Sequence, residues 1–214
     1  MDLFSNEPDL LSLPYEEVEK IALSCTKCPL SKGRTKVVFG NGPVPCDLML
    51  IGEAPGAEED LQGLPFVGRA GQLLTQILAS VGLKRPDDIY IANTVKCRPP
   101  ENRAPLATEQ GACAPYLEAQ IKFVKPKIIL LAGSPAVKAI LKSDEPMSKI
   151  RGKWLKLPGT DISVMPIFHP AYLLRNPQKT KGSPKWLTWQ DVQEVKNALE
   201  YIRKVGELAK ESGD

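Results

Sequence analysis

The stretch K-I-I-L-L-A-G-S-P-A-V-K-A-I-L-K-S, residues 127–143, decides the fold. Its first half is a continuous apolar run that ends at a glycine, which is typical of a strand buried on both faces. Its second half has apolar residues at helical spacing, with Ser134 as the expected N-cap and Pro135 at the first helical position. A buried strand followed directly by a helix is the repeating unit of a parallel sheet covered by helices.

The same alternation continues on both sides of this unit. Other apolar runs predict strands over residues 47–53, 88–97 and 162–170. Helices are expected over residues 15–25, 70–82, 106–124 and 186–210, and residues 151–159 read as an extended piece and a turn. We therefore expect one α/β domain over residues 1–214, a three-layer α/β/α sandwich with a parallel central sheet, whose residues 1–14 form a loose arm.

The composition is that of an ordinary soluble protein, with 43% hydrophobic and 25% charged residues in a chain of 214. No apolar run approaches the length of a membrane span, and the N-terminal M-D-L-F-S-N-E-P lacks the pattern of a signal peptide. We therefore expect a cytoplasmic protein with no membrane partner. The formal net charge of +3 permits a local basic groove, but it is too small to indicate a nucleic-acid partner by itself.

Each expected strand ends in residues with reactive or polar side chains, or in a glycine. These residues are Glu53, Asn93, Ser134 and His169, each within or directly after the last part of an expected strand. In open parallel sheets, ligands bind outside the carboxyl ends of the strands, so these residues are expected at one edge. His169 is the only histidine in the chain, and by itself it could be a half-buried structural imidazole. Its place among the other strand ends favours a site residue.

Two loops carry most of the remaining candidates. Residues 52–74 contain five glycines, several carboxylates and Phe66, which is either an anchor of the loop or a stacking platform. Asn93 opens the second loop, N-T-V-K-C-R-P-P-E-N-R-A-P, and its carboxamide can read the hydrogen-bonding edge of a nucleobase. The basic side chains of that loop are candidates for phosphate contacts: Lys96, Arg98 and Arg103.

Four of the five cysteines are candidate metal ligands. Cys25 and Cys28 form a C-x-x-C pair, Cys97 ends the second strand, and Cys113 follows sixteen residues later. Four thiolates can bind a zinc ion or an iron–sulfur cluster, and the spacing does not choose between them. Cys46 is expected to be a small buried apolar residue.

The order of these motifs resembles the family 4 uracil-DNA glycosylases, the iron–sulfur members of the uracil-DNA glycosylase superfamily. The resemblance lies in G-E-A-P-G, P-F-V-G, N-x-x-x-C-R-P-P and H-P-A, and it covers about residues 15–205. It implies a four-stranded parallel sheet between helices, and an enzyme that flips uracil out of DNA, hydrolyses its N-glycosidic bond and leaves an abasic site. It also implies a [4Fe–4S] cluster on Cys25, Cys28, Cys97 and Cys113.

The resemblance further assigns roles to single residues. Phe66 would stack on the flipped uracil, Asn93 would read the base, and the Glu53-Ala54 turn would line the pocket. Glu59 matches a pocket carboxylate, although the adjacent Glu58 offers a rival alignment. His169 would face uracil O2. Because cleavage leaves an anionic base and a cationic sugar, we expect a neutral His169 to donate a hydrogen bond to O2, and Glu53 to hold the water and stabilise the sugar cation.

Contacts with DNA are expected from the loop after Asn93 and from the segment after His169. Leu173 or Leu174 is the candidate wedge that fills the gap left by the flipped base. The candidate phosphate contacts that we retain are Arg98, Arg103 and Arg175. We expect a monomer that acts on uracil in single- or double-stranded DNA without a strand-cleaving step.

The sequence leaves two rival functions open. One is a superfamily relative that traps itself covalently on DNA through a histidine after the second strand, which the absence of histidine from residues 98–105 disfavours. The other is a non-enzymatic nucleic-acid-binding module with a zinc ion or an iron–sulfur cluster. Such a module would not need Glu53, Asn93 and His169 to converge.

Overall fold

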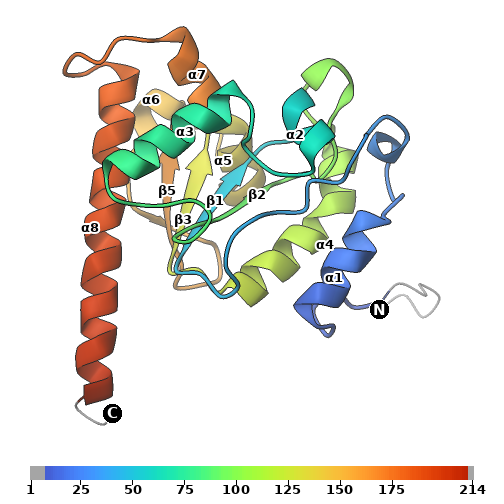
Figure 1. The fold of residues 1–214 in the computed structure, drawn as a ribbon, viewed down its shortest axis with the longest axis horizontal. Helices are drawn as coiled ribbons and strands as arrows, with labels where there is room; N and C mark the ends of the chain where they lie inside the picture. The colour runs from blue at the N-terminus through green and yellow to red at the C-terminus, as the bar shows by residue number, and fades with distance from the viewer. Residues whose placement is uncertain (1–7, 212–214) are drawn as a thin grey trace.

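A five-stranded sheet runs through the middle of the computed structural model, which describes residues 8–211 and their side chains as far as residue 207. The strand order is β2-β1-β3-β5-β4, and Figure 1 labels the four parallel strands among them. The strands are β1 (Leu48–Gly52), β2 (Tyr90–Asn93), β3 (Ile128–Ala132), β4 (Leu155–Lys156) and β5 (Ser163–Ile167). The α-helices are α1 (Tyr15–Leu23), α2 (Ala57–Gln62), α3 (Arg69–Ser80), α4 (Ala107–Val124), α5 (Ser134–Leu141), α6 (Met147–Ile150), α7 (Pro170–Arg175) and α8 (Pro184–Glu211). Two short 3₁₀ helices are η1 (Pro29–Lys32) and η2 (Pro100–Asn102).

Four neighbouring strands, β2, β1, β3 and β5, are parallel to one another. All residues of β1, β2 and β3 are buried, as their continuous apolar runs predict for strands covered on both faces. The α/β sandwich is therefore confirmed. The sheet has one strand more than expected, because β4 pairs antiparallel with β5 at the edge. β4 has only two residues, which are partly or fully exposed, so no apolar run marked it as a strand.

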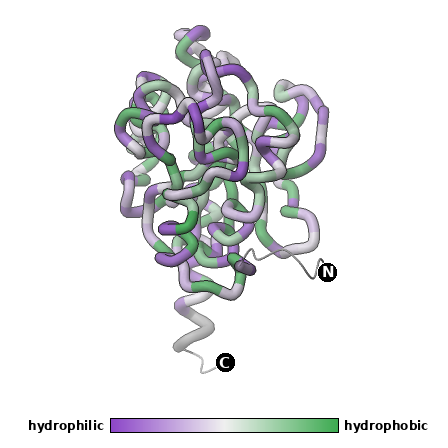
Figure 2. The backbone as a smooth tube through the Cα atoms, turned by 90° about the vertical axis from the view of Figure 1, so that its right-hand side faces the viewer, coloured by the Kyte–Doolittle hydropathy of each residue, from purple (hydrophilic) through white to green (hydrophobic). Residues whose placement is uncertain are grey.

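Helices pack against both faces of the sheet. On one face α3, α7 and α8 contribute buried apolar side chains that pack on Leu48, Leu50 and Leu130. On the other face α4, α5 and α6 pack on Met49, Ile51 and Leu131. The helix α8 lies along one side and extends beyond the body of the molecule, as Figures 1 and 2 show. Within residues 8–211, no helix combines the length and the apolar character needed to cross a membrane.

Two local expectations from the sequence are wrong. Residues 1–7 of the expected arm lie outside the described residues, but Leu10 is buried in a cluster with Val18 of α1, so the end of the arm is packed. The helix α5 begins at Ser134, and the residue before it is Gly133 with φ +88°, so Ser134 is not the N-cap. Glycine has no Cβ, and it therefore reaches this conformation without steric cost.

The sheet brings the ends of its parallel strands to one edge. Gly52 at the end of β1 pairs with Asn93 at the end of β2, and Ala132 of β3 pairs with Ile167 of β5. The loops that follow these strands consequently begin side by side, as expected for the ligand-binding edge of an open parallel sheet.

Candidate active site

A cleft of about 890 Å³ opens at this edge. Its walls include every residue that the sequence placed around the base: Glu53, Ala54, Glu59, Phe66, Asn93 and His169. These residues come from the end of β2 and from the segments after β1 and β5, so only the folded sheet brings them together.

Asn93 is the last residue of β2, and only 2% of it is exposed. Among the described residues, none donates a hydrogen bond to its side-chain Oδ1, which is buried at the cleft. Its backbone oxygen accepts a hydrogen bond of 2.7 Å from Lys96 Nζ. Buried polar atoms are nearly always paired, so an unpaired acceptor beside a cleft indicates a partner that arrives with the ligand.

Gly52 allows two side chains of the cleft to approach the end of β1. A Cβ at this position would lie 2.4 Å from Oδ1 of Asn93 and 2.7 Å from Cζ of Phe66. Distances below 3 Å would force these side chains apart. The glycine is therefore required by the close approach of the two side chains.

Phe66 has φ +53°, a left-handed conformation that is rare for a bulky residue. Its ring centroid lies 5.8 Å from that of His169, with an angle of 36° between the rings. Backbone conformations of this kind cluster at functional sites, where the surrounding structure holds them. The ring is thereby presented to the cleft next to the only histidine.

His169 precedes α7, and its Nδ1 accepts a hydrogen bond of 3.1 Å from the backbone N–H of Ala171. Nδ1 therefore carries no proton, and the proton of the neutral ring is on Nε2. Burial, assisted by the charge of Arg175, lowers the pKa of His169 to about 4. The imidazole is consequently neutral at physiological pH.

The two carboxylates of the cleft have different surroundings. Burial raises the pKa of Glu53 above its ordinary value. Glu59 accepts hydrogen bonds from the backbone N–H groups of Gly56, Val67 and Gly68 at 3.1, 2.9 and 2.9 Å. Glu58 is exposed, so the geometry favours Glu59 over its neighbour as the pocket carboxylate.

The four candidate ligand cysteines line one small cavity between α1, η1 and α4. Arg34 Nη1 lies 3.3 Å from Sγ of Cys97, and the backbone N–H of Lys96 donates to Sγ of Cys113 at 3.3 Å. In the part of the chain that the structure describes, no group of three or more His, Cys, Asp or Glu side chains is arranged to hold a metal ion. Cys46 is buried elsewhere and donates to the backbone oxygen of Leu48, as expected of a small buried residue.

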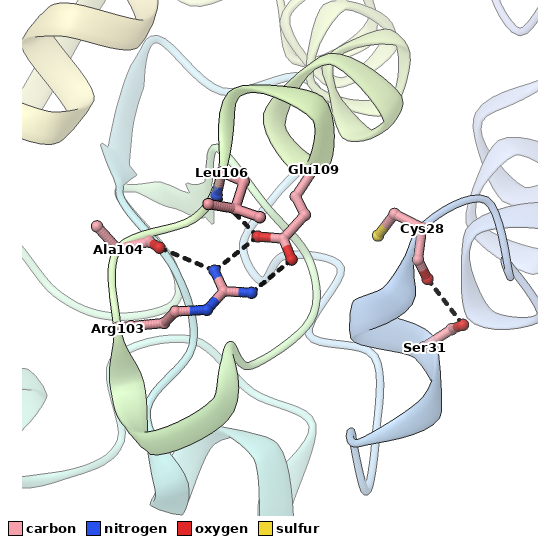
Figure 3. Close-up of polar contacts among 6 residues, drawn as sticks. All are labelled: Cys28, Ser31, Arg103, Ala104, Leu106 and Glu109. Atoms are coloured by element: carbon pink, nitrogen blue, oxygen red, sulfur yellow. Dashed lines mark hydrogen bonds and ion pairs between the residues drawn. The ribbon is translucent and has the colours of Figure 1, made fainter.

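The loop over residues 98–106 is held by an ion pair that the sequence did not indicate. Both Nη atoms of Arg103 bind the carboxylate of Glu109, at 2.9 and 2.7 Å, and one of them also donates to the backbone oxygen of Ala104 (Figure 3). Glu109 further accepts from the N–H of Leu106 and is almost fully buried. Hydrogen bonds from Arg103 lower the pKa of Glu109. The guanidinium of Arg103 is thus already engaged within the protein.

The structure corrects two of the expected DNA contacts. Leu173 has no exposed surface and packs in the core with α3 and α8, so it is not the wedge. Lys96 is buried and donates to Asn93 and Gln120, so it does not reach a phosphate. Arg175 lies on the wall of the cleft, and Arg98 lies in the loop with its Nε on Oδ1 of Asn102.

The fold and the cleft define the class of the protein. The family model described as the uracil DNA glycosylase superfamily matches residues 39–193, and the chain belongs to this superfamily. It is 40% identical over 199 residues to the type-4 uracil-DNA glycosylase of Thermotoga maritima, an alignment that covers 92% of this chain and 97% of that protein. With the type-4 uracil-DNA glycosylase of Saccharolobus solfataricus it shares 42% identity over 198 residues, or 89% of this chain and 87% of that protein. The chain is accordingly a member of the type-4 uracil-DNA glycosylase family.

A more distant relative belongs to another type. The type-5 uracil-DNA glycosylase of Pyrobaculum aerophilum is 30% identical over 158 residues, which are 60% of this chain and 70% of that protein.

Proposed function

We propose that this chain is a DNA-repair glycosylase that flips uracil out of DNA and hydrolyses its N-glycosidic bond, leaving an abasic site. One observation carries the proposal. A single cleft at the carboxyl edge of the sheet is lined by a buried carboxamide, an aromatic ring, a neutral imidazole and two carboxylates. The type-4 relatives bear the name of this activity.

Asn93 is proposed to read the base. Uracil presents an N3–H donor beside the O4 acceptor, and a carboxamide can pair with both. Oδ1, which is unpaired among the described residues, is available to accept from N3–H. Cytosine reverses this pattern and would leave the buried carboxamide mispaired, which costs more than the loss of one hydrogen bond. Phe66 would stack on the face of the flipped ring, with Ala54 lining the pocket.

His169 and Glu53 are proposed to act on the glycosidic bond. Its cleavage leaves an anionic base and a cationic sugar, so catalysis is mainly electrostatic. The neutral imidazole donates from Nε2 to uracil O2 as negative charge develops there. Glu53 holds the attacking water and stabilises the sugar cation. None of the described cleft residues is a lysine, which supports hydrolysis without a strand-cleaving step.

DNA would lie across the mouth of the cleft. Arg175 on its wall and Arg98 in the neighbouring loop are proposed phosphate contacts. Arg103 is proposed to hold that loop in place through its ion pair with Glu109. The part of its side chain that stays exposed is the only part that can contact a DNA phosphate. Leu174, which is partly exposed, replaces Leu173 as the candidate wedge. We propose that the enzyme acts as a monomer on uracil in single- or double-stranded DNA.

A [4Fe–4S] cluster is proposed to bind Cys25, Cys28, Cys97 and Cys113. Four thiols around one cavity, with Arg34 and a backbone N–H directed at two of the sulfurs, match the surroundings of a cluster with thiolate ligands. A zinc ion could use the same four thiolates, and the resemblance to the iron–sulfur glycosylases is what favours the cluster over zinc. When bound, the cluster would tie the loop after Asn93 to α1.

Release of uracil from a labelled oligonucleotide tests the proposed function. The substrates should include U·G and U·A duplexes, single-stranded uracil and a uracil-free control. We expect free uracil and an intact abasic strand from the first three. A non-enzymatic binding module, the rival function, would bind these oligonucleotides without releasing any base.

A further inference from the structure

Phe66 holds its unusual backbone conformation because charged side chains bind the backbone on both sides of it. Glu59 accepts hydrogen bonds from the N–H groups of Val67 and Gly68, at 2.9 Å each. Arg85 donates from Nη1 to the backbone oxygen of Phe66 and from Nη2 to that of Pro65, at 2.8 Å each. The turn over residues 65–68 is thus held by an anion on its N–H groups and a cation on its carbonyl groups.

Arg85 itself lies outside the cleft. It belongs to the segment between α3 and β2, and it does not line the cavity that contains Phe66. Its Nη1 also donates to Oγ1 of Thr75 at 3.0 Å, and that hydroxyl donates in turn to the backbone oxygen of Gly71. The guanidinium that binds the turn is therefore also held by Thr75 of α3.

The turn has little room to move toward α3. A Cβ at Gly71 would lie 1.8 Å from the backbone oxygen of Phe66, so that oxygen sits directly against the first turn of the helix. The same oxygen accepts from Arg85. Loss of the guanidinium would remove the only hydrogen bond that the described residues make to this carbonyl, and the left-handed residue could relax to a more common conformation.

We propose that Arg85 is a positioning residue that acts on uracil through Phe66. By binding the carbonyl groups of Pro65 and Phe66, it keeps the aromatic ring over the base site beside His169. The inference rests on the proposed function and assigns a role there to a residue that touches neither the base nor the reacting atoms.

The test is a double-mutant cycle on the single-turnover rate of uracil release from a U·G duplex. We expect R85M to lose roughly ten- to a hundredfold in rate, because small displacements of a positioned group are costly. R85K, which can reach one carbonyl group but does not reproduce the planar fork, should fall between R85M and the unchanged chain. K84M changes the adjacent exposed side chain and should leave the rate unchanged.

The decisive comparison is made in a chain that already lacks the ring. In the F66A background, R85M should slow release by no more than about twofold, because the ring that Arg85 positions is gone. Inhibition by free uracil should weaken in R85M and F66A alike. If the effects of R85M and F66A multiply, Arg85 acts independently of Phe66 and the proposal is wrong. An R85M rate equal to that of the unchanged chain would also overturn it.

Folding is checked separately. The melting temperature and circular dichroism of each variant are measured. If R85M does not fold, R85K takes its place in the double-mutant cycle. Failure of the unchanged chain to release uracil would overturn the proposed function instead, so the two failures are distinguishable.

Discussion

The backbone N–H of Ala171 donates to Nδ1 of His169, which leaves the proton of the neutral ring on Nε2. The helix α7 thus fixes the tautomer of the ring that faces the cleft. A donor that is already neutral and oriented needs no rearrangement when negative charge develops on the base.

H169N should lower the single-turnover rate of uracil release by about a hundredfold or more, the usual cost of removing one donor to a developing anion. Its melting temperature should change little. DNA binding, measured by fluorescence anisotropy, should be nearly unchanged because it depends mainly on phosphate contacts. A rate equal to that of the unchanged chain would make His169 a structural residue only.

The pH dependence follows from the same histidine. Its folded pKa of about 4 lies below the value of about 6.5 for an unfolded histidine, so the folded chain binds fewer protons between these pH values. Its contribution to stability is therefore complete above about pH 6.5 and is lost as the pH falls toward 4. The single-turnover rate should stay constant from pH 7 to 8, and a rate that collapses there together with a titration of His169 would contradict the neutral donor.

N93D should lose the preference for uracil. An ionised carboxylate has no donor for O4, and its two acceptors would suit the amino group of cytosine better only if a proton were available to pair with N3. Single-turnover rates on U·G and C·G duplexes measure the preference. Full activity of N93D on uracil would mean that Asn93 does not read the base.

C97S should lose the brown colour that we expect from about four irons per chain, whereas C46S should keep it. Cys97 lies in the cavity of four thiols, and Cys46 is buried in another cluster. Iron analysis and visible absorbance of protein prepared without oxygen decide the outcome. One tightly bound zinc in a colourless protein would contradict the cluster and would indicate a zinc site instead.

E109Q should destabilise the loop over residues 98–106 and lower the melting temperature by roughly 3 °C or more. Hydrogen bonds from Arg103 lower the folded pKa of Glu109, so its stabilising effect is present above about pH 4.3 and is lost as the pH falls through the folded pKa. Melting curves from pH 3 to 7 should show the difference between the unchanged chain and E109Q at its largest near neutrality. Equal melting temperatures at pH 7 would show that the ion pair does not stabilise the loop.

L173A should cost about 2–5 kcal/mol in the free energy of unfolding, because it leaves a cavity in the core. L174A should cost less and should slow uracil release from duplex DNA more than from single strands, since only a duplex leaves a gap to fill. Urea unfolding and single-turnover rates separate the two effects. If L174A slowed both substrates equally, Leu174 would not be the wedge.

The sequence was sufficient to place Glu53, Asn93 and His169 at one site. Each lies at or just after the end of a strand with an apolar run, and neighbouring parallel strands end at the same edge. The edge strand β4 was missed as a strand because two residues with some exposure carry no periodic pattern.

Contacts between segments that are distant in the chain could not be predicted from the sequence. Lys96 looked like a phosphate contact, but its ammonium is buried against Gln120, 24 residues away, and no local pattern reports such a partner. Leu173 and Leu174 differ by one position in a helix of six residues, which is too short for periodicity to show which of them faces the core.

Gly52 links the two side chains that are proposed to read the base and to stack on it, Asn93 and Phe66. Any substitution there adds a Cβ that meets both the carboxamide of Asn93 and the ring of Phe66. A substitution at this position would therefore disturb both proposed roles at once. An evolving chain must therefore keep a hydrogen atom as the side chain at the tip of β1 for as long as both side chains approach it this closely.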